Sequence, residues 1–238
     1  MGFLMKIYHL KYKNKSVPCY ITYKKVKNIN MRISADQGVK ISVPKGLDFQ
    51  VITDFIESKK DWIIKKVTKF EMMKNINPKI LKEGIKLYYL GEEYTLLIEE
   101  GDDYVKINNN NLVIFSSDCS HKNIKKVFYQ WQKKKSRLVF MKILEDVYPF
   151  VQIYGVKYPK LKVKKMVTRW GSCSCSKGNI NMNQFLVALP VEVIRYVMFH
   201  ELAHFIEPNH SRNFYKIIEK FMPNYTVYRK YLKNIRLR

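Results

Sequence analysis

Residues 191–210 read VEVIRYVMFHELAHFIEPNH and contain three of the five histidines of this 238-residue chain. Apolar residues recur every three or four positions along the segment, a spacing that is typical of an amphipathic helix. Pro190 precedes the run, at a position that favours the start of a helix. Because four residues advance a helix by about 400°, His200 and His204 project from the same face, one turn apart. The segment therefore predicts a helix that presents two imidazoles side by side.

This pair of histidines has the spacing of a metal site. Two imidazole nitrogens one helical turn apart can bind one tetrahedral Zn²⁺ at about 2.0–2.1 Å each. Glu201 is rotated about 100° from His200, so it can lie beside the ion without binding it and accept a proton from water. Pro208 and Asn209 predict a break in the helix that would bring His210 back as a third ligand. Three protein ligands leave one position open, which is typical of a catalytic zinc.

Two alternatives to this metal site are considered. The spacing of the three histidines equals that of the metzincin proteases, but Glu207 lies where those proteases carry glycine, and no convincing Met-turn follows His210. We therefore do not expect a metzincin. The other alternative is a helix that carries two histidines and binds no metal at all.

Composition excludes several classes of protein. Hydrophobic residues make up 47% of the chain and aromatic residues 14%, which disordered, collagen-like and low-complexity chains lack. No stretch approaches the roughly 18 uncharged apolar residues of a membrane helix, and the first residues lack the apolar core of a signal peptide. Four cysteines at irregular spacing are too few for a disulfide scaffold. We expect a cytoplasmic protein without a membrane partner.

The charge of the chain leaves two interpretations open. Lysine and arginine number 44 against 20 acidic residues, which gives a net charge of +24. This excess favours a basic groove for nucleic acid or another polyanion. However, arginine, which nucleic-acid readers prefer for bidentate contacts, is scarce. A solvated lysine surface without a specific partner is the alternative.

Hydrophobic periodicity predicts an α+β protein. Alternating residues at 31–35 and 39–43 predict a β-hairpin with its turn at 36–38, and two more hairpins are expected at 86–98 and 104–115. Helical periodicity predicts one helix from about residue 49 to the Asn-Pro pair at 77–78, and another over 121–147. No internal repeat is visible. We expect a β-hairpin-rich N-terminal α+β region at 1–118 and a catalytic region at 119–238.

Several motifs together resemble the YgjP-like metallopeptidase family, a zincin-type group related in pattern to SprT-like proteins. The motifs are Arg169-Trp-Gly-Ser-Cys173, Gly178-Asn-Ile-Asn-Met-Asn183, His200-Glu-Leu-Ala-His204, Asn209-His-Ser211 and Phe214-Tyr215. The hairpin at 31–44, the helix with Trp62 and the segment 88–91 resemble its N-terminal half. The resemblance implies one zinc ion bound by His200, His204 and His210, with Glu201 as catalytic residue. It also implies a zincin-like C-terminal half, in which the metal-binding helix lies beside a small antiparallel sheet.

The polar segment just before this helix is a candidate for substrate binding. Zincins bind an extended peptide along an edge strand upstream of the metal helix, by strand addition. Residues 179–187 occupy that position in the sequence, so Asn181 and Asn183 are candidate substrate contacts; the alternative is an ordinary core strand. Arg169 could hold a carboxylate, a phosphate or an oxyanion, and the alternative is an arginine on the surface.

Two further local features concern the surroundings of the helix. Cys173 and Cys175 match no common zinc spacing, so we expect buried thiols there and not a second metal site. Ser211 precedes a short helical pattern, where it is predicted to be the N-cap and to help fix His210.

The sequence therefore predicts a zinc metallopeptidase that acts on a peptide or protein substrate. Glu201 would be the general base for the attacking water. A metal-dependent nucleotide hydrolase, whose surplus lysines and Arg169 seat the phosphates, is the second hypothesis. A third is that the basic N-terminal half tethers either hydrolase to nucleic acid or another polyanion.

Overall fold

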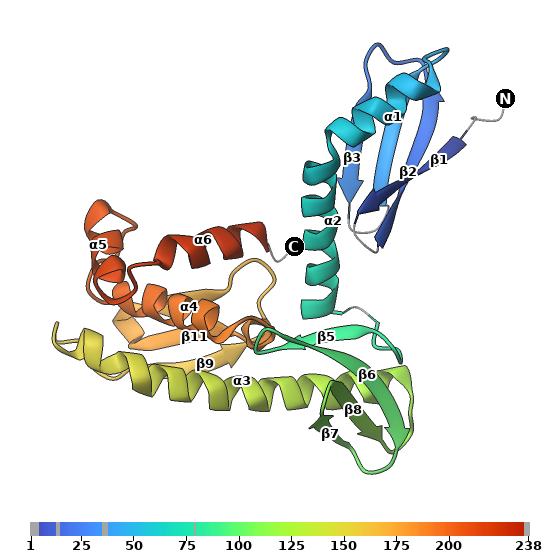
Figure 1. Ribbon diagram of the computed structural model, residues 1–238. Helices are drawn as coiled ribbons and strands as arrows, with labels where there is room; N and C mark the ends of the chain where they lie inside the picture. Colours follow the sequence, from blue (N-terminus) through green and yellow to red (C-terminus); the bar gives the residue numbers. More distant parts are fainter. Residues whose placement is uncertain (1–4, 13–14, 35–37, 79, 236–238) are drawn as a thin grey trace. The chain divides into compact units, whose positions relative to one another are not determined.

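The computed structural model describes residues 5–12, 15–34, 38–78 and 80–235 (Figure 1). Helices and strands both contribute substantially, so the predicted α+β class is confirmed. The chain divides into two compact units, Met1–Lys74 and Asn75–Arg238. No described helix combines the length and the apolar composition that a membrane span requires.

The first unit is a four-stranded sheet with the order β1-β2-β4-β3 and two helices. Its elements are β1 (Met5–Tyr12), β2 (Lys15–Lys24), β3 (Asn30–Ser34), β4 (Gly38–Pro44), α1 (Phe49–Ser58) and α2 (Lys60–Ile76). Alternate residues of β2 and β4 are buried together with the apolar face of α1, including Ile21, Ile41 and Ile52. The alternation in the sequence thus decides which face of the sheet the helix covers.

Two predictions for this unit can be compared with the structure. The hairpin is confirmed, since β3 pairs antiparallel with β4 and Met31 lies opposite Ile41, while residues 35–37 of its turn lie outside the described part. The single helix predicted from residue 49 is wrong, because the chain forms two helices. Lys59 caps the first with its N–H on the Glu57 and Ile56 carbonyls, and its backbone φ of −103° departs from helical values.

The second unit begins with another four-stranded sheet, in the order β5-β6-β8-β7. Its strands are β5 (Lys86–Tyr89), β6 (Glu92–Glu100), β7 (Tyr104–Asn108) and β8 (Asn111–Ser116). Both predicted hairpins are confirmed, and β6 and β8 pair in parallel between them. The first unit's sheet has the same order and the same strand directions, so the structure repeats a topology of which the sequence gives no sign.

The long helix α3 (His121–Gln152) belongs to the same compact unit as the second sheet. Ile124, Val127 and Phe128 on this helix share a core with apolar residues of β5, β6 and β8. For this reason the second compact unit begins at Asn75 and includes both this sheet and α3. The start of a catalytic region at residue 119 stays a prediction. Figure 1 shows α3 running from this sheet, at one end of the unit, to the elements that carry the histidines.

The remaining elements surround the other end of α3. They are β9 (Lys160–Lys164), β10 (Gly171–Ser174), the short helices η1 (Cys175–Lys177) and η2 (Gln184–Ala188), β11 (Asn179–Asn183), α4 (Val191–Ala203), α5 (Arg212–Phe221) and α6 (Tyr225–Asn234). The three strands form a sheet in the order β10-β11-β9. It is mixed and not antiparallel as expected, because β9 pairs in parallel with β11.

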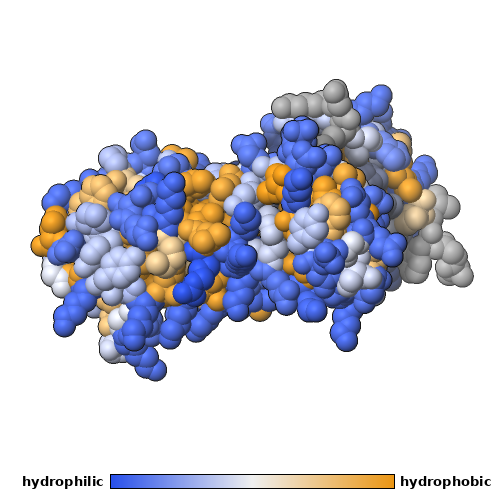
Figure 2. Space-filling view, turned by 90° about the horizontal axis from the view of Figure 1, so that it is seen from below, coloured by the Kyte–Doolittle hydropathy of each residue, from blue (hydrophilic) through white to orange (hydrophobic). Residues whose placement is uncertain are grey.

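The face of the molecule shown in Figure 2 is mostly hydrophilic, with separate apolar patches between the polar side chains. This is the appearance expected for a chain with 44 lysine and arginine residues. A nucleic-acid or other polyanionic partner stays a prediction.

Buried polar bonds join α3 to the segment that leads into α4. The Ser136 hydroxyl lies 2.7 Å from the Gln132 carbonyl and 2.9 Å from the Gln184 carbonyl, and the Gln184 side chain donates to Gln132 Oε1 over 3.2 Å. All three residues are buried. Because buried polar groups are costly to leave unpaired, this network fixes η2, and with it the start of α4, on α3.

We predict that Ser136→Ala destabilises the second unit by about 1–3 kcal/mol, because it removes a hydrogen-bond partner from the buried Gln184 carbonyl. Urea unfolding followed by fluorescence measures the change. Lys134→Ala, on the exposed side of the same helix, is the matched control and should change the stability by less than about 0.5 kcal/mol. Equal stability of the two variants would show that the buried network does not hold η2.

Candidate metal centre

The helix α4 carries His200 and Glu201 in its last turn, and His204 is its C-terminal cap residue. Pro190 stands at its N-cap, as predicted from the sequence. Most of the helix is buried in the second unit, which fixes its rotation about its axis. The buried residues include Val193, Ile194, Val197, Met198, Leu202 and Ala203.

The chain turns sharply after α4. The Ile206 N–H donates to the Ala203 carbonyl over 3.0 Å and thereby closes the turn. The helix thus ends before the break that was predicted at Pro208 and Asn209. The consequence is the predicted one, since the chain no longer runs along the helix axis.

The position of His210 is fixed by the helix that follows it. Ser211 Oγ accepts a 3.2 Å hydrogen bond from the Phe214 N–H at the start of α5, so the predicted N-cap is confirmed. The cap anchors the backbone directly after His210, and the turn after α4 anchors it before.

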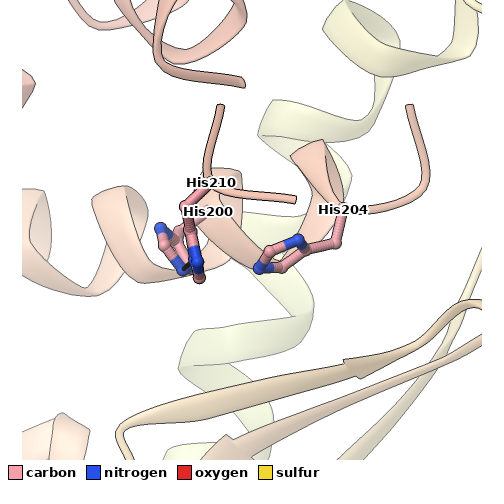
Figure 3. Close-up of side chains that lie close together, drawn as sticks. All are labelled: His200, His204 and His210. Atoms are coloured by element: carbon pink, nitrogen blue, oxygen red, sulfur yellow. Dashed lines mark hydrogen bonds between the residues drawn. The ribbon is translucent and has the colours of Figure 1, made fainter. Parts of the chain in front are cut away.

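The three imidazoles converge on one point (Figure 3). His200 Nε2 and His210 Nε2 lie 3.0 Å apart, and one nitrogen from each of the three rings falls within 4.8 Å of the others. The ring centroid of His204 lies 5.1 Å from that of His200 and 4.8 Å from that of His210. This cluster could hold one metal ion.

The second ring nitrogen of His204 has a defined role. Its Nδ1 lies 3.0 Å from the Pro208 carbonyl, which can only accept, so Nδ1 carries the proton and Nε2 keeps its lone pair. A backbone carbonyl on the far nitrogen is a common way to orient a metal-binding histidine. The turn that ends with Pro208 therefore sets both the ring orientation and the tautomer.

Burial keeps the imidazoles of the helix neutral. Burial, and next the neighbouring His204 and His210, lower the pKa of His200 to about 3. Burial and His210 also lower the pKa of His204. Neutral imidazoles are the form that binds a metal, so His200 and His204 do not have to lose protons near neutral pH. Within the described residues, the buried His200 Nδ1 has no hydrogen-bond partner.

Phe214 forms one wall of the cluster. Its side chain is 0% exposed, and its ring centroid lies 5.0, 4.7 and 4.8 Å from those of His200, His204 and His210. A buried ring in contact with all three imidazoles limits their rotation and keeps water from that side. The sequence placed Phe214 in a family motif without a role, because only the folded chain brings α5 against α4.

Glu201 is buried beside a glycine of the adjacent strand. Glu201 as a whole is only 5% exposed. A methyl group at Gly171 would lie 2.5 Å from Glu201 Oε1 and 2.8 Å from its Cγ, so any larger residue there would displace the carboxylate. The backbone of Gly171 has ordinary dihedral angles, and glycine is needed here for space. Spacing in the sequence gives no sign of this contact.

The charge state of Glu201 depends on opposing influences. Burial raises the pKa of its carboxyl to about 8, while the Arg169 guanidinium and a hydrogen bond from the Cys173 backbone N–H act in the opposite direction. A carboxyl with a pKa near neutrality can both take up and release a proton. The charge of Arg169 thus acts on Glu201. The Arg169 side chain is exposed, so it is also accessible from solvent.

Asn183 does not fit its predicted substrate contact. Its side chain is 0% exposed, and its amide donates to the carbonyls of Met166 and Arg169 over 2.8 Å each. Its Oδ1 accepts from the Phe185 N–H at 3.2 Å and from the Met166 N–H at 3.5 Å. These bonds use its full capacity, so Asn183 holds the loop that carries Arg169 and offers nothing to a substrate.

The predicted substrate strand is also corrected. β11 is the central strand of its sheet and pairs with β10 on one side and β9 on the other, so no edge is free for a peptide. Asn181, on this strand, is half-buried and donates to Ser172 Oγ over 3.1 Å. The strand at the end of the sheet that contacts α4 is β10, which the sequence did not distinguish from a loop.

Both Cys173 and Cys175 are predicted from the sequence to be buried, but the structure buries neither of them fully. Cys173 is half-buried in β10, and Cys175 is exposed at the start of η1. Burial raises the pKa of the Cys173 thiol. Neither cysteine belongs to the candidate metal-binding cluster, which among the described residues consists of the three histidines.

A family model agrees with the motifs. A family model described as YgjP-like, metallopeptidase domain matches residues 27–235. A crystal structure of the metallopeptidase zymogen of Pyrococcus abyssi abylysin is 22% identical; the match covers 39% of this chain and 90% of that chain, with a TM-score of 0.36. Curated protein sequences give no match. Because the family model spans most of the chain, this protein belongs to the YgjP-like metallopeptidase family, as its motifs predict.

Proposed function

We propose that this chain is a zinc-dependent peptidase in which His200, His204 and His210 bind the ion and Glu201 is the general base. The region 119–238 would then be the catalytic region, with a zincin-like arrangement of helix and strand. One observation carries the proposal: three imidazoles, two of them kept neutral by burial, converge, and the residue that follows His200 on the same helix is a buried carboxylate.

The donor set fits zinc. Two ligand nitrogens at 2.0–2.1 Å from a tetrahedral ion are about 3.3 Å apart, and the two Nε2 atoms of His200 and His210 are 3.0 Å apart. Small ring rotations would therefore suffice to bind an ion. Imidazole ligands suit zinc among the common divalent metals, and a three-histidine set leaves a position open.

Zinc would supply Lewis acidity, which polarises a carbonyl oxygen and acidifies water. The chain's own contribution is proton transfer by Glu201. Its carboxylate would accept a proton from the attacking water and deliver it to the nitrogen of the leaving amine. The walls of the site, Gly171 on one side of the carboxylate and Phe214 against the imidazoles, would hold these groups in place.

The free side of β10 is the best candidate for substrate binding. An extended peptide can add to the end of a sheet through backbone hydrogen bonds, which recognise a chain independently of its side chains. β10 carries Gly171, which touches Glu201, so a peptide added there would lie next to the carboxylate. Arg169, which is exposed and acts on the charge of Glu201, could bind a carbonyl or carboxylate of that peptide.

We predict that Glu201→Gln binds zinc as the parent chain does but loses at least about 100-fold in the rate of peptide hydrolysis, because the amide cannot accept a proton. Cleavage of labelled, denatured casein measures the rate, and elemental analysis of protein purified without an affinity tag measures the zinc. Glu219→Gln, an exposed carboxylate on α5, is the control and should leave both values unchanged. Full activity of Glu201→Gln would refute the assigned role.

The same preparations separate the peptidase from a nucleotide hydrolase. Incubation with ATP, followed by measurement of released phosphate, should give no turnover above that of the zinc salt alone. Phosphate release that requires Glu201, in a protein that leaves casein intact, would favour the nucleotide hydrolase.

We also predict that Gly171→Ala lowers the hydrolysis rate by about 10- to 100-fold while zinc content is kept. The added methyl group would push the Glu201 carboxylate aside, and displacements of about 1 Å have effects of this size. Gly101→Ala is the matched control, because its methyl group would meet Phe115 at an ordinary 3.4 Å. A Gly171→Ala chain as active as the Gly101→Ala chain would contradict the packing argument.

A further inference from the structure

Two thiols lie side by side at the end of β10. Cys173 Sγ and Cys175 Sγ are 3.2 Å apart, although residues two apart in a strand are separated by a full pleat. They approach because the strand ends at Ser174, where φ is −121° and ψ is 84°, and η1 begins with Cys175. A disulfide has an S–S length of about 2.0 Å, so the sulfurs need to move together by only about 1.2 Å.

Both cysteines are hydrogen-bonded to residues of the proposed site. The Cys175 thiol donates to the His204 carbonyl over 3.1 Å. The Cys173 N–H donates to the Glu201 carboxylate, and the same strand carries the glycine against which Glu201 packs. A covalent change at this pair therefore acts on the residues that position the general base and one of the imidazoles.

We propose that Cys173 and Cys175 form a reversible disulfide with a small-molecule disulfide as oxidant, and that this bond switches the hydrolase off. The bond formation stands on the geometry of the two thiols alone. The switching rests on the function proposed above.

The exchange takes place in two steps. The exposed Cys175, as thiolate, attacks one sulfur of glutathione disulfide; the glutathione S–S bond breaks, a mixed disulfide forms and one glutathione thiolate leaves. Cys173, after losing its proton to solvent, then attacks the Cys175 sulfur and releases the second glutathione. In total the two protein thiols lose two electrons and two protons, and the oxidant is reduced to two glutathione molecules.

The disulfide would change the site in two ways. Cys175 would lose its S–H and with it the hydrogen bond to the His204 carbonyl. Drawing the two sulfurs together would also pull the end of β10 toward η1, and the strand's contacts with Glu201 would shift with it. Displacement of a general base by a fraction of an ångström to 1 Å is sufficient to slow catalysis strongly.

The bond is tested first, without reference to activity. The full chain with Cys119→Ser, which removes the other exposed cysteine, is loaded with zinc and incubated with glutathione disulfide. After alkylation, peptide mass spectrometry should find Cys173 linked to Cys175, and dithiothreitol should restore both thiols. Two free thiols at equilibrium, or a stable glutathione adduct on Cys175 beside a free Cys173, would overturn the proposal.

The switch is tested by the ratio of casein hydrolysis rates before and after oxidation. The Cys119→Ser chain should lose about tenfold or more on oxidation and recover with dithiothreitol. The matched Cys119→Ser, Cys175→Ser chain retains a hydroxyl donor for the His204 carbonyl but cannot form the bond, so its ratio should stay near one. Equal rates of the oxidised and reduced chains would overturn the switch. If the disulfide forms in a chain that cleaves no peptide in either state, the proposed function fails and the bond stands.

Discussion

The site depends on one constraint, which is that three imidazoles must reach the same point with their lone pairs free. His200 and His204 lie one helical turn apart, so the helix α4 alone brings these two imidazoles together. The third requires the chain to leave α4 and return, which the turn after Ala203 and the Ser211 cap accomplish. The Pro208 carbonyl in this turn also holds the proton of His204 on the far nitrogen. Backbone geometry and ligand chemistry are thus set by the same few residues.

The remaining structure holds this arrangement in place. Phe214 packs against all three rings, and the buried network between α3 and η2 fixes the start of α4. β10 packs against α4 and leaves room for the Glu201 carboxylate only because residue 171 is glycine. The strand that packs against Glu201 is also the one whose end carries two adjacent thiols, so the same contacts connect the proposed general base to a pair of oxidisable side chains.

Local features were predictable from the sequence, and pairings between distant segments were not. The helix of the histidines, the Ser211 cap and the hairpins follow from periodicity and turn chemistry within about ten residues. The position of β11 in the middle of its sheet depends on pairing with β9 and β10, which alternation cannot reveal. For the same reason the sequence predicts Asn183 as a substrate contact, although the carbonyls to which its amide donates lie 14 to 17 positions earlier in the chain. The role of Gly171 is visible only once β10 lies against α4.

The central claim is that one zinc ion is bound by three nitrogen atoms. Diffraction from crystals of the zinc-loaded chain, recorded on both sides of the zinc absorption edge, tests it most directly. The account predicts one strong anomalous peak, about 2.0–2.1 Å from the Nε2 atoms of His200, His204 and His210. A peak bound by only two of these rings, with His210 turned into solvent, would contradict it.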